Sequence, residues 1–243
     1  MSGAVAIWHD IAAEGLAEFY AWHGEEHMPE RVSIPGFTCG RRFIARNADL
    51  QFFNLYETQS PEVVRSPDYK ARLDSPTPRT LSAVRHFRHV ARSLCRVVAM
   101  HDGAERGSAQ GGLAATLRYD IDEAREATDL AIFRDAVMPA LAASPGIAAI
   151  RLLAADRAAS GYVNAEQRAR GAANAVPPVV LVVESWADEA AFGALLEAGL
   201  SPDTLARHGL GGAAVLGLYA HQLTVLNQTG APRAEDQRFG SGR

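Results

Sequence analysis

The chain repeats one short pattern of residues at a spacing of 110 positions. Residues 28–36 read MPERVSIPG, and residues 138–146 read MPALAASPG. Setting Pro29 on Pro139 also brings Arg41 onto Arg151 without a gap. Agreement of this kind indicates two copies of one structural unit in a single chain. It constrains the possible fold more than any other feature of the sequence.

Each copy is predicted to alternate strands and helices. The strands are rich in β-branched and aromatic residues, and the helices carry apolar residues at three- and four-residue spacing. Pro35-Gly36 is expected to end the first helix, since proline disfavours helix in the residue before it. The first copy has expected strands at 4–11, 37–45, 50–58 and 89–100 and helical regions at 12–31 and 60–86. The second has expected strands at 113–121, 147–155, 178–185 and 213–223 and helices at 130–143 and 188–198.

This order is the βαββαβ order of a ferredoxin-like unit. A sheet of four strands with two helices on one face leaves its other face uncovered, so a second copy must cover it. We therefore predict an α+β fold in which two tandem ferredoxin-like units form a pseudo-dimeric α+β barrel. The first unit spans residues 1–103 and the second 111–226, with a glycine-rich linker near 101–112 and a polar tail, 227–243, expected to be disordered.

The two copies differ in length between their second and third strands. The first copy has four residues there, 46–49, whereas the second has an insertion of about twenty, 157–178. Loops of that length inside a compact domain are usually functional lids or disordered segments. Both interpretations are open at the level of sequence.

Composition excludes several classes of partner. Lys and Arg number 24 against 28 Asp and Glu, so the formal charge of −4 provides no basic field for nucleic acid. No apolar run reaches the roughly 18 residues that span a bilayer, and the first residues do not read as a signal peptide. Cys39 and Cys95 lie in strand-like segments without a short-range partner, as buried thiols do in a reducing compartment. We expect a cytoplasmic protein.

The segment WHGEEHMPERVSIPGFTCGRRF (residues 22–43), followed by FFNLYE (52–57), carries a family resemblance. It resembles the dimeric α+β barrel superfamily, and within it the EthD and Dabb groups, in which a helix ends in a Trp-x-x-x-Glu-His-x-Pro-Glu-Arg type of motif. The resemblance implies a ferredoxin-like fold with a site between each sheet and its helices. Relatives include cofactor-independent monooxygenases, lactone isomerases, dehydratases and decarboxylases that act on aromatic or polyketide-like compounds, together with haem enzymes.

The histidine of that motif falls on His27, and the resemblance implies that it transfers protons. An imidazole titrates near neutral pH and suits this role. The alternative is a histidine that only packs at the helix end. The second copy has Val137 at this position while keeping Met-Pro and Pro-Gly, which favours a role peculiar to the first copy.

Other polar residues are candidates to assist His27. His23 lies one helical turn earlier and Glu30 three residues later, so the three are expected to share a helix face. Tyr56 could line an aromatic pocket or belong to the core. Adjacent Arg41 and Arg42 point in opposite directions along a strand, so one of them could bind a substrate anion.

Each candidate also has a structural alternative. Arg41 and Glu57 have counterparts in Arg151 and Glu184, which favours an ion pair repeated in each copy. Glu30 and Arg31 could form an exposed helix face. The string HGEEH matches a zinc-protease pattern, H-x-x-E-H, and His86, His89 and His101 could add metal ligands, although strand-end histidines are usually solvated. His9 is a secondary candidate for proton transfer.

We therefore expect a cofactor-independent lyase or isomerase that acts on a small aromatic or polyketide-like molecule. The candidate catalytic residues are His27, His23, Glu30, Arg41 and Tyr56, with no organic cofactor and no metal. The alternatives are a cofactor-free monooxygenase of the same superfamily and a non-catalytic protein that binds a small molecule or haem. Neither nucleic acid nor membrane is an expected partner, and a homodimer is possible.

Overall fold

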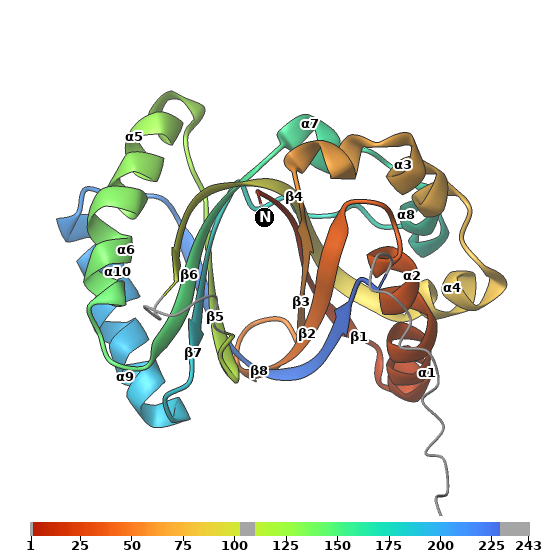
Figure 1. The fold of residues 1–243 in the computed structure, drawn as a ribbon, viewed down its shortest axis with the longest axis horizontal. Helices are drawn as coiled ribbons and strands as arrows, with labels where there is room; N and C mark the ends of the chain where they lie inside the picture. The colour runs from red at the N-terminus through yellow and green to blue at the C-terminus, as the bar shows by residue number, and fades with distance from the viewer. Residues whose placement is uncertain (1, 103–109, 229–243) are drawn as a thin grey trace, which may run out of the picture.

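The computed structural model of the chain describes residues 2–102 and 110–228. Within these residues, eight strands close into one antiparallel barrel in the order β1-β3-β2-β8-β5-β7-β6-β4 (Figure 1). The strands are β1 (Gly3–Ile11), β2 (Phe37–Asn47), β3 (Phe52–Thr58), β4 (Phe87–Asp102), β5 (Leu113–Tyr119), β6 (Ile147–Ala155), β7 (Val179–Ser185) and β8 (Ala214–Leu226). The predicted α+β barrel of two tandem βαββαβ units is confirmed.

Helices flank the barrel on two opposite sides (Figure 1). The first copy contributes η1 (Ala13–Gly15), α1 (Leu16–Trp22), η2 (His23–His27), α2 (Met28–Val32), η3 (Pro61–Arg65), α3 (Pro67–Asp74), α4 (Pro78–Ala83) and η4 (Val84–His86). The second contributes η5 (Glu123–Arg125), α5 (Glu126–Ile132), η6 (Phe133–Val137), α6 (Met138–Ala142), α7 (Arg157–Ser160), α8 (Ala165–Arg170), α9 (Glu189–Leu200) and α10 (Pro202–Arg207). Helices α7 and α8 lie on the side of the first copy, beside α3 (Figure 1).

Two local features recur at the same place in both copies. The helix η2 is a π-helical turn, and so is η6 in the second copy. Such turns are rare and often occur at functional sites. A few residues later Gly36 has φ of 88° and Gly146 has φ of 90°, a backbone conformation that glycine adopts without strain. The repeated Pro-Gly therefore ends the helix in each copy, as predicted.

Hydrogen-bonded strands join the two copies. β2 of the first copy pairs with β8 of the second, and β4 pairs with β6. These ladders occupy the sheet edges that each copy would otherwise expose. Inside the barrel the two sheets share one core, which includes Trp8, Phe53 and Tyr219. The indole nitrogen of Trp8 donates a hydrogen bond across the barrel to Thr116 Oγ1 at 3.0 Å.

Four buried charged residues form a network inside the barrel. Arg41 donates to Glu57 Oε1 at 2.5 Å and to Glu184 Oε2 at 2.6 Å. Arg151 donates to the other oxygen of Glu184, and its second terminal nitrogen lies 3.6 Å from Glu57. The ion pair expected in each copy is present, but each arginine also reaches the glutamate of the other copy. The network therefore bridges the two halves of the chain.

The insertion of the second copy covers the first copy. We call residues 156–178 the lid; it contains α7 and α8. Its Ala175 exchanges backbone hydrogen bonds with β4, accepting from Arg92 N at 2.8 Å and donating to Val90 O at 3.0 Å. Ser160 Oγ accepts from Leu94 N at 2.9 Å. Of the two sequence interpretations of this segment, the structure shows an ordered cover.

The structure differs from the sequence predictions at a few boundaries. β4 continues through His101 and Asp102, which pair with β6, so these two residues belong to the strand and not to the linker. The short helix α10 was not expected, because two turns are too few to show a clear periodicity. The rest of the tail, 229–243, lies outside the described residues. Among the helices described, none is long and apolar enough to cross a membrane.

Candidate functional site

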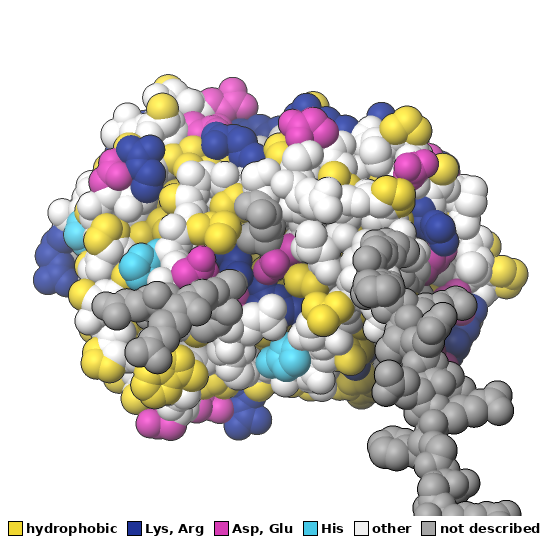
Figure 2. Space-filling view, in the orientation of Figure 1, with side chains coloured by type: hydrophobic (Ala, Val, Ile, Leu, Met, Phe, Trp, Pro, Cys, Tyr) yellow, Lys and Arg dark blue, Asp and Glu magenta, His cyan; other side chains and the backbone are white. Residues whose placement is uncertain are grey.

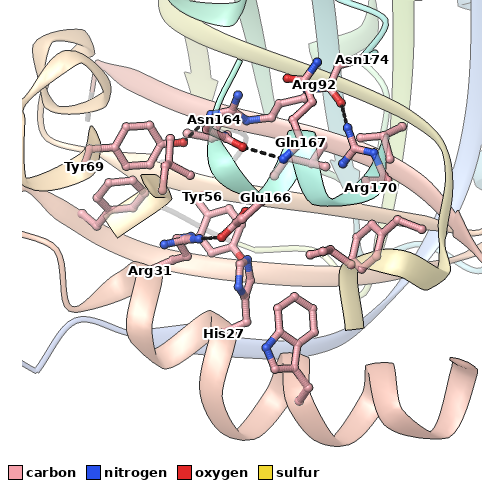
Figure 3. A pocket seen from close by; sticks show the side chains of 18 residues that line it. His27, Arg31, Tyr56, Tyr69, Arg92, Asn164, Glu166, Gln167, Arg170 and Asn174 are labelled. Carbon is pink, nitrogen blue, oxygen red and sulfur yellow. Dashed lines mark hydrogen bonds and ion pairs between the residues drawn. The ribbon is translucent and has the colours of Figure 1, made fainter. Parts of the chain in front are cut away.

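A cavity of about 70 Å³ lies between the sheet of the first copy, its helices and the lid (Figure 3). Apolar and aromatic side chains form much of its wall. Its charged or polar lining includes His27, Arg31, Tyr56, Arg92, Glu166 and Arg170. A wider surface groove of about 470 Å³ shares the wall made by Tyr69, Leu73 and Arg92. We call the smaller space the site cavity.

Both copies contribute to the site cavity. The π-helical turn η2 positions His27, and the following helix α2 positions Arg31. Tyr56 comes from β3 and Arg92 from β4. The lid helix α8 supplies Glu166 and Arg170 from the opposite side, as Figure 3 shows. The site of the first copy is therefore closed by a segment that lies in the second half of the sequence.

His27 is held as a neutral imidazole at the wall of the site cavity. Its ring lies 4.4 Å from the ring of Trp22 and 5.5 Å from that of His23, measured between centroids. Burial lowers the pKa of His27 well below its usual value, and the nearby Arg31 guanidinium lowers that pKa further. Its Nδ1 atom is buried and has no hydrogen-bond partner among the described residues. A neutral ring with a free nitrogen can accept a proton.

Two further histidines lie behind His27 in the same layer. Burial lowers the pKa of His23 well below its usual value, and it lowers the pKa of His9 to about 3. Arg42 Nη1 lies 3.3 Å from His23 Nδ1, and Asn54 Nδ2 lies 3.0 Å from His9 Nε2. Guanidinium and amide nitrogens only donate, so each histidine accepts through the named atom. Both rings are neutral, and neither lines the site cavity.

Three arginines face the site cavity, and one of them has a carboxylate partner. Arg31 forms an ion pair with Glu166. Arg92 donates to the hydroxyl of Tyr69 at 2.7 Å, and Arg170 donates to Asn174. Among the described residues, no carboxylate lies within ion-pair distance of Arg92 or Arg170. The side chains that line this cavity therefore carry an excess of positive charge.

Several polar atoms around the site cavity have no partner in the described part of the chain. The buried atoms in question are His27 Nδ1, Tyr56 OH, Arg31 Nη1, Arg92 Nη1 and Arg170 Nε. Burial raises the pKa of Tyr56, so its hydroxyl stays protonated and can donate. Unpaired buried donors are uncommon in folded proteins, and water or a ligand usually satisfies them. Their concentration here indicates a place for a polar ligand.

The structure separates the five residues proposed from sequence. His27 and Tyr56 line the site cavity, and His23 stacks behind His27. Glu30 instead points to the outer face of the helix, where it accepts from Arg72 at 2.9 Å. Arg41 lies in the barrel interior, on the opposite face of the sheet. Neither Glu30 nor Arg41 shares a cavity with His27.

Sequence reasoning missed the charged residues that complete the site. For Arg31 an exposed helix face is one expectation from the sequence, but the side chain is 5% exposed and lines the cavity. The other residues, Arg92, Glu166 and Arg170, were not identified. The run AEQRAR within the insertion was the one available signal, since a lid carrying several charges could bring them over a site.

The H-x-x-E-H string does not assemble a metal site. Its Glu26 accepts from Thr77 Oγ1 at 2.5 Å, away from the two histidine rings. In the part of the chain that the structure describes, no group of three or more His, Cys, Asp or Glu residues could hold a metal ion. The string therefore does not bring its three residues together as metal ligands, and of the two histidines only His27 lines the site cavity.

The second copy has apolar residues at the corresponding positions. The sequence offset and the strand registers pair His23 with Phe133, His27 with Val137, Arg31 with Leu141, Arg42 with Leu152, Asn54 with Leu181, Tyr56 with Val183 and Arg92 with Leu216. All seven of these apolar residues belong to, or pack against, one core cluster. The polar site is a property of the first copy alone.

Comparison with known proteins identifies the fold but not a family. No protein-family model matches the chain. No curated protein matches it either. The membership of the EthD or Dabb groups that the sequence motif implies is therefore not shown.

Solved structures match the chain over nearly its whole length. An anthrone oxidase-like protein has a TM-score of 0.61 and 13% identity, with 93% of each chain covered. Two proteins named as candidate monooxygenases follow. The protein from Lactobacillus acidophilus has a TM-score of 0.54 at 10% identity, covering 93% of this chain and 97% of its own. The protein from Fusobacterium nucleatum subsp. nucleatum has a TM-score of 0.56 at 9% identity, covering 93% and 95%. At these identities the likeness concerns the fold, and this chain has the ferredoxin-like α+β barrel fold of those proteins.

Proposed function

We propose that the chain is an enzyme that removes a proton from a small aromatic molecule in the site cavity and directs the resulting anion to molecular oxygen. The reaction needs neither a metal nor an organic cofactor. One observation carries the proposal: a buried, neutral His27 with an unpartnered nitrogen faces a cavity lined by arginines. Base and anion-stabilising groups therefore meet in one space of the first copy.

The chemistry divides between these groups. His27 accepts a proton from an activated CH₂ carbon of the substrate, and the positive charge of the arginines stabilises the carbanion that remains. Oxygen takes up the electron pair as a carbon–oxygen bond forms, and the imidazolium returns its proton to give a hydroperoxide. Loss of water from that hydroperoxide yields a ketone. Each step balances with oxygen as the co-reactant.

The low pKa of His27 suits a base that must be ready at neutral pH. The imidazole is unprotonated over the whole physiological range, so no proton has to leave before substrate binds. A base with a low pKa is also weak, and it can deprotonate only a carbon whose anion is strongly stabilised. The three arginines and the conjugation of an aromatic substrate provide that stabilisation.

The site cavity has to enlarge before such a substrate can enter. Engineered cavities that take up benzene measure about 150 Å³, roughly twice the volume found here. The lid is the one wall of the cavity that is not part of the first copy's βαββαβ unit, and the surface groove lies beside it. The described conformation is therefore a closed one, and the substrate enters as the lid moves.

The same residues could carry out proton transfer without oxygen, as a lyase or isomerase would. A base beside stabilised positive charge also serves enolisation, so this second candidate depends on the same observation. The names of the structural neighbours favour the oxygenase. Oxygen consumption separates the two, since only the oxygenase removes oxygen from solution in step with product formation.

The test is a panel of anthrone-type, phenolic and lactone compounds, followed by an oxygen electrode and by mass spectrometry of the products. His27→Ala is expected to lower kcat by about 100-fold or more on any substrate found. His101→Ala, at an exposed strand-end position, is the matched control and keeps full activity. Unchanged turnover in His27→Ala would refute the mechanism. Product formation without oxygen uptake would refute the oxygenase and support the lyase or isomerase.

A further inference from the structure

The charges around the site cavity are unbalanced. Arg31, Arg92 and Arg170 face it, whereas Glu166 is the one carboxylate among the described lining residues, and His27 is neutral. Arg31 and Arg92 are 5% and 7% exposed. A buried charge without a partner is costly, and evolution retains such charges mainly where a ligand completes them. The arginines therefore indicate an anionic ligand.

Each of the two arginines that have no carboxylate partner, Arg92 and Arg170, has a free donor, as Arg31 also has at Nη1. Nη1 of Arg92 and Nε of Arg170 are buried and unpartnered, while the other ends of the two guanidinium groups are fixed by Tyr69 and Asn174. Guanidinium groups that are fixed at one end are oriented in advance for planar acceptors. A carboxylate is such an acceptor, and two oxygens can engage two donors at once.

Glu166 shows that this cavity accommodates a carboxylate. Its side chain comes down from the lid helix α8 and binds Arg31, while His27 reaches the cavity from the helix on the opposite side (Figure 3). The carboxylate belongs to the same lid that has to move when a substrate enters. It therefore occupies a cationic cavity in the closed state and is removed from it as the lid opens.

We propose that the substrate carries a carboxylate that Arg92 and Arg170 bind, and that Glu166 competes with it for the cationic cavity while the lid is closed. This proposal deepens the function proposed above, since it names the substrate class of the same site. Arg170 and Glu166 both come from the lid helix α8, so lid closure would bring the recognition group and the competing carboxylate to the cavity together. Neutral phenols and lactones are then poorer ligands than aromatic acids of the same size.

Calorimetric titration tests the proposal without any turnover. The probes are acetate, benzoate and 1-naphthoate, each compared with its neutral amide. At least one acid is expected to bind about tenfold or more tightly than its amide. Arg170→Gln and Arg92→Gln are each expected to weaken that binding by about tenfold. Amides that bind as well as the acids, or three acids that do not bind, would overturn the proposal.

Two variants of the lid separate recognition from structure. Arg168 lies on α8 two residues from Arg170 but faces outward, where it pairs with Asp74. Arg168→Gln is therefore the matched control, and it should leave acid binding within about twofold of the wild type. Glu166→Gln removes the competing carboxylate and is expected to tighten acid binding by several-fold. Weaker or unchanged binding in Glu166→Gln would show that Glu166 does not compete, which would overturn that part of the proposal.

The two proposals fail in different ways. Arginine-dependent acid binding combined with unchanged turnover in His27→Ala would refute the proposed reaction and keep the substrate class. If instead a neutral substrate is turned over in a His27-dependent reaction and the acids do not bind, the proposed substrate class is refuted and the proposed reaction is kept. Circular dichroism spectra of each variant show whether a lost signal reflects unfolding.

Discussion

The two helix-and-sheet layers of this chain share a backbone plan and differ in what fills them. Both have a π-helical turn followed by Met-Pro and a Pro-Gly helix end. In the first copy His27 stands in that turn and faces a cavity, whereas Val137 stands there in the second and packs in a continuous apolar core. The π-helical turn is therefore a feature of the fold that both copies share. The site exists in the first copy because of the side chains that its turn carries.

The second copy also serves the first copy directly. Its insertion forms the lid, while in the first copy only residues 48–51 separate β2 from β3, too few to form a comparable cover. The layer of the second copy buries the carboxylate of Asp129, which Tyr119 and Arg125 satisfy, whereas the first copy buries histidines and arginines with unpartnered atoms. Duplication in one chain thus allows one half to hold the site and the other to stabilise and close it.

The largest expected effect concerns the network that joins the halves. Glu184→Gln leaves Arg41 and Arg151 with too little negative charge in the barrel interior, and removal of one partner from a buried pair costs about 3–5 kcal/mol. Urea unfolding, followed by fluorescence and circular dichroism, measures the loss. Glu189→Gln, which breaks an exposed pair with Arg46, is the control and should cost less than about 1 kcal/mol. Equal losses would show that the network does not couple the copies.

The next effect tests whether the second copy can accept the residue of the first. Val137→His places a ring of larger volume and two polar atoms in a close-packed apolar layer, and we expect a loss of about 2–4 kcal/mol in unfolding free energy at pH 7. Thermal and urea unfolding measure it. A loss below 1 kcal/mol would mean that the two layers are interchangeable and that the contrast drawn between them is superficial.

A smaller effect appears as a pH dependence of stability. His9, His23 and His27 have folded-state pKa values below the unfolded value, so the unfolded chain binds more protons as the pH falls. Stability is therefore complete above about pH 6.5 and declines below it, by up to about 1.4 kcal/mol per pH unit for each histidine. His23→Phe, which copies Phe133 of the second unit, should make this decline shallower. Identical slopes for this variant and the wild type, measured by urea unfolding at pH 7.5, 6.0 and 5.0, would contradict the assignment.

The smallest effect on stability is expected for His27→Val, the reverse of the exchange at Val137. Removal of a buried imidazole with an unpartnered nitrogen stabilises the folded chain, and the somewhat larger cavity that remains destabilises it, so the two contributions oppose each other. We expect a change within about 1 kcal/mol in either direction, together with loss of activity. A loss of more than 2 kcal/mol would indicate that His27 serves packing in the first copy.

Much of the fold could be predicted from the sequence, because its signals are local. Strand alternation, helical periodicity and Pro-Gly located most elements within a few residues, and the 110-residue offset revealed the two units. For the candidate site, the contrast between His27 and Val137 selected the copy with the cavity. Glu30 was expected on the face of His27, but the cavity receives Arg31, four residues after His27, while Glu30 turns outward to Arg72.

What the sequence determined by itself was the duplicated plan and the position of His27, which the second copy replaces by Val137. Only the tertiary structure decided that Arg41 points into the barrel, that β2 meets β8 and β4 meets β6, and that the lid brings Arg170 over the first copy. The physical reason is the distance along the chain between the residues that interact. Periodicity and turn chemistry act over a few residues, whereas these contacts join segments far apart in the chain and exist only once the barrel has closed.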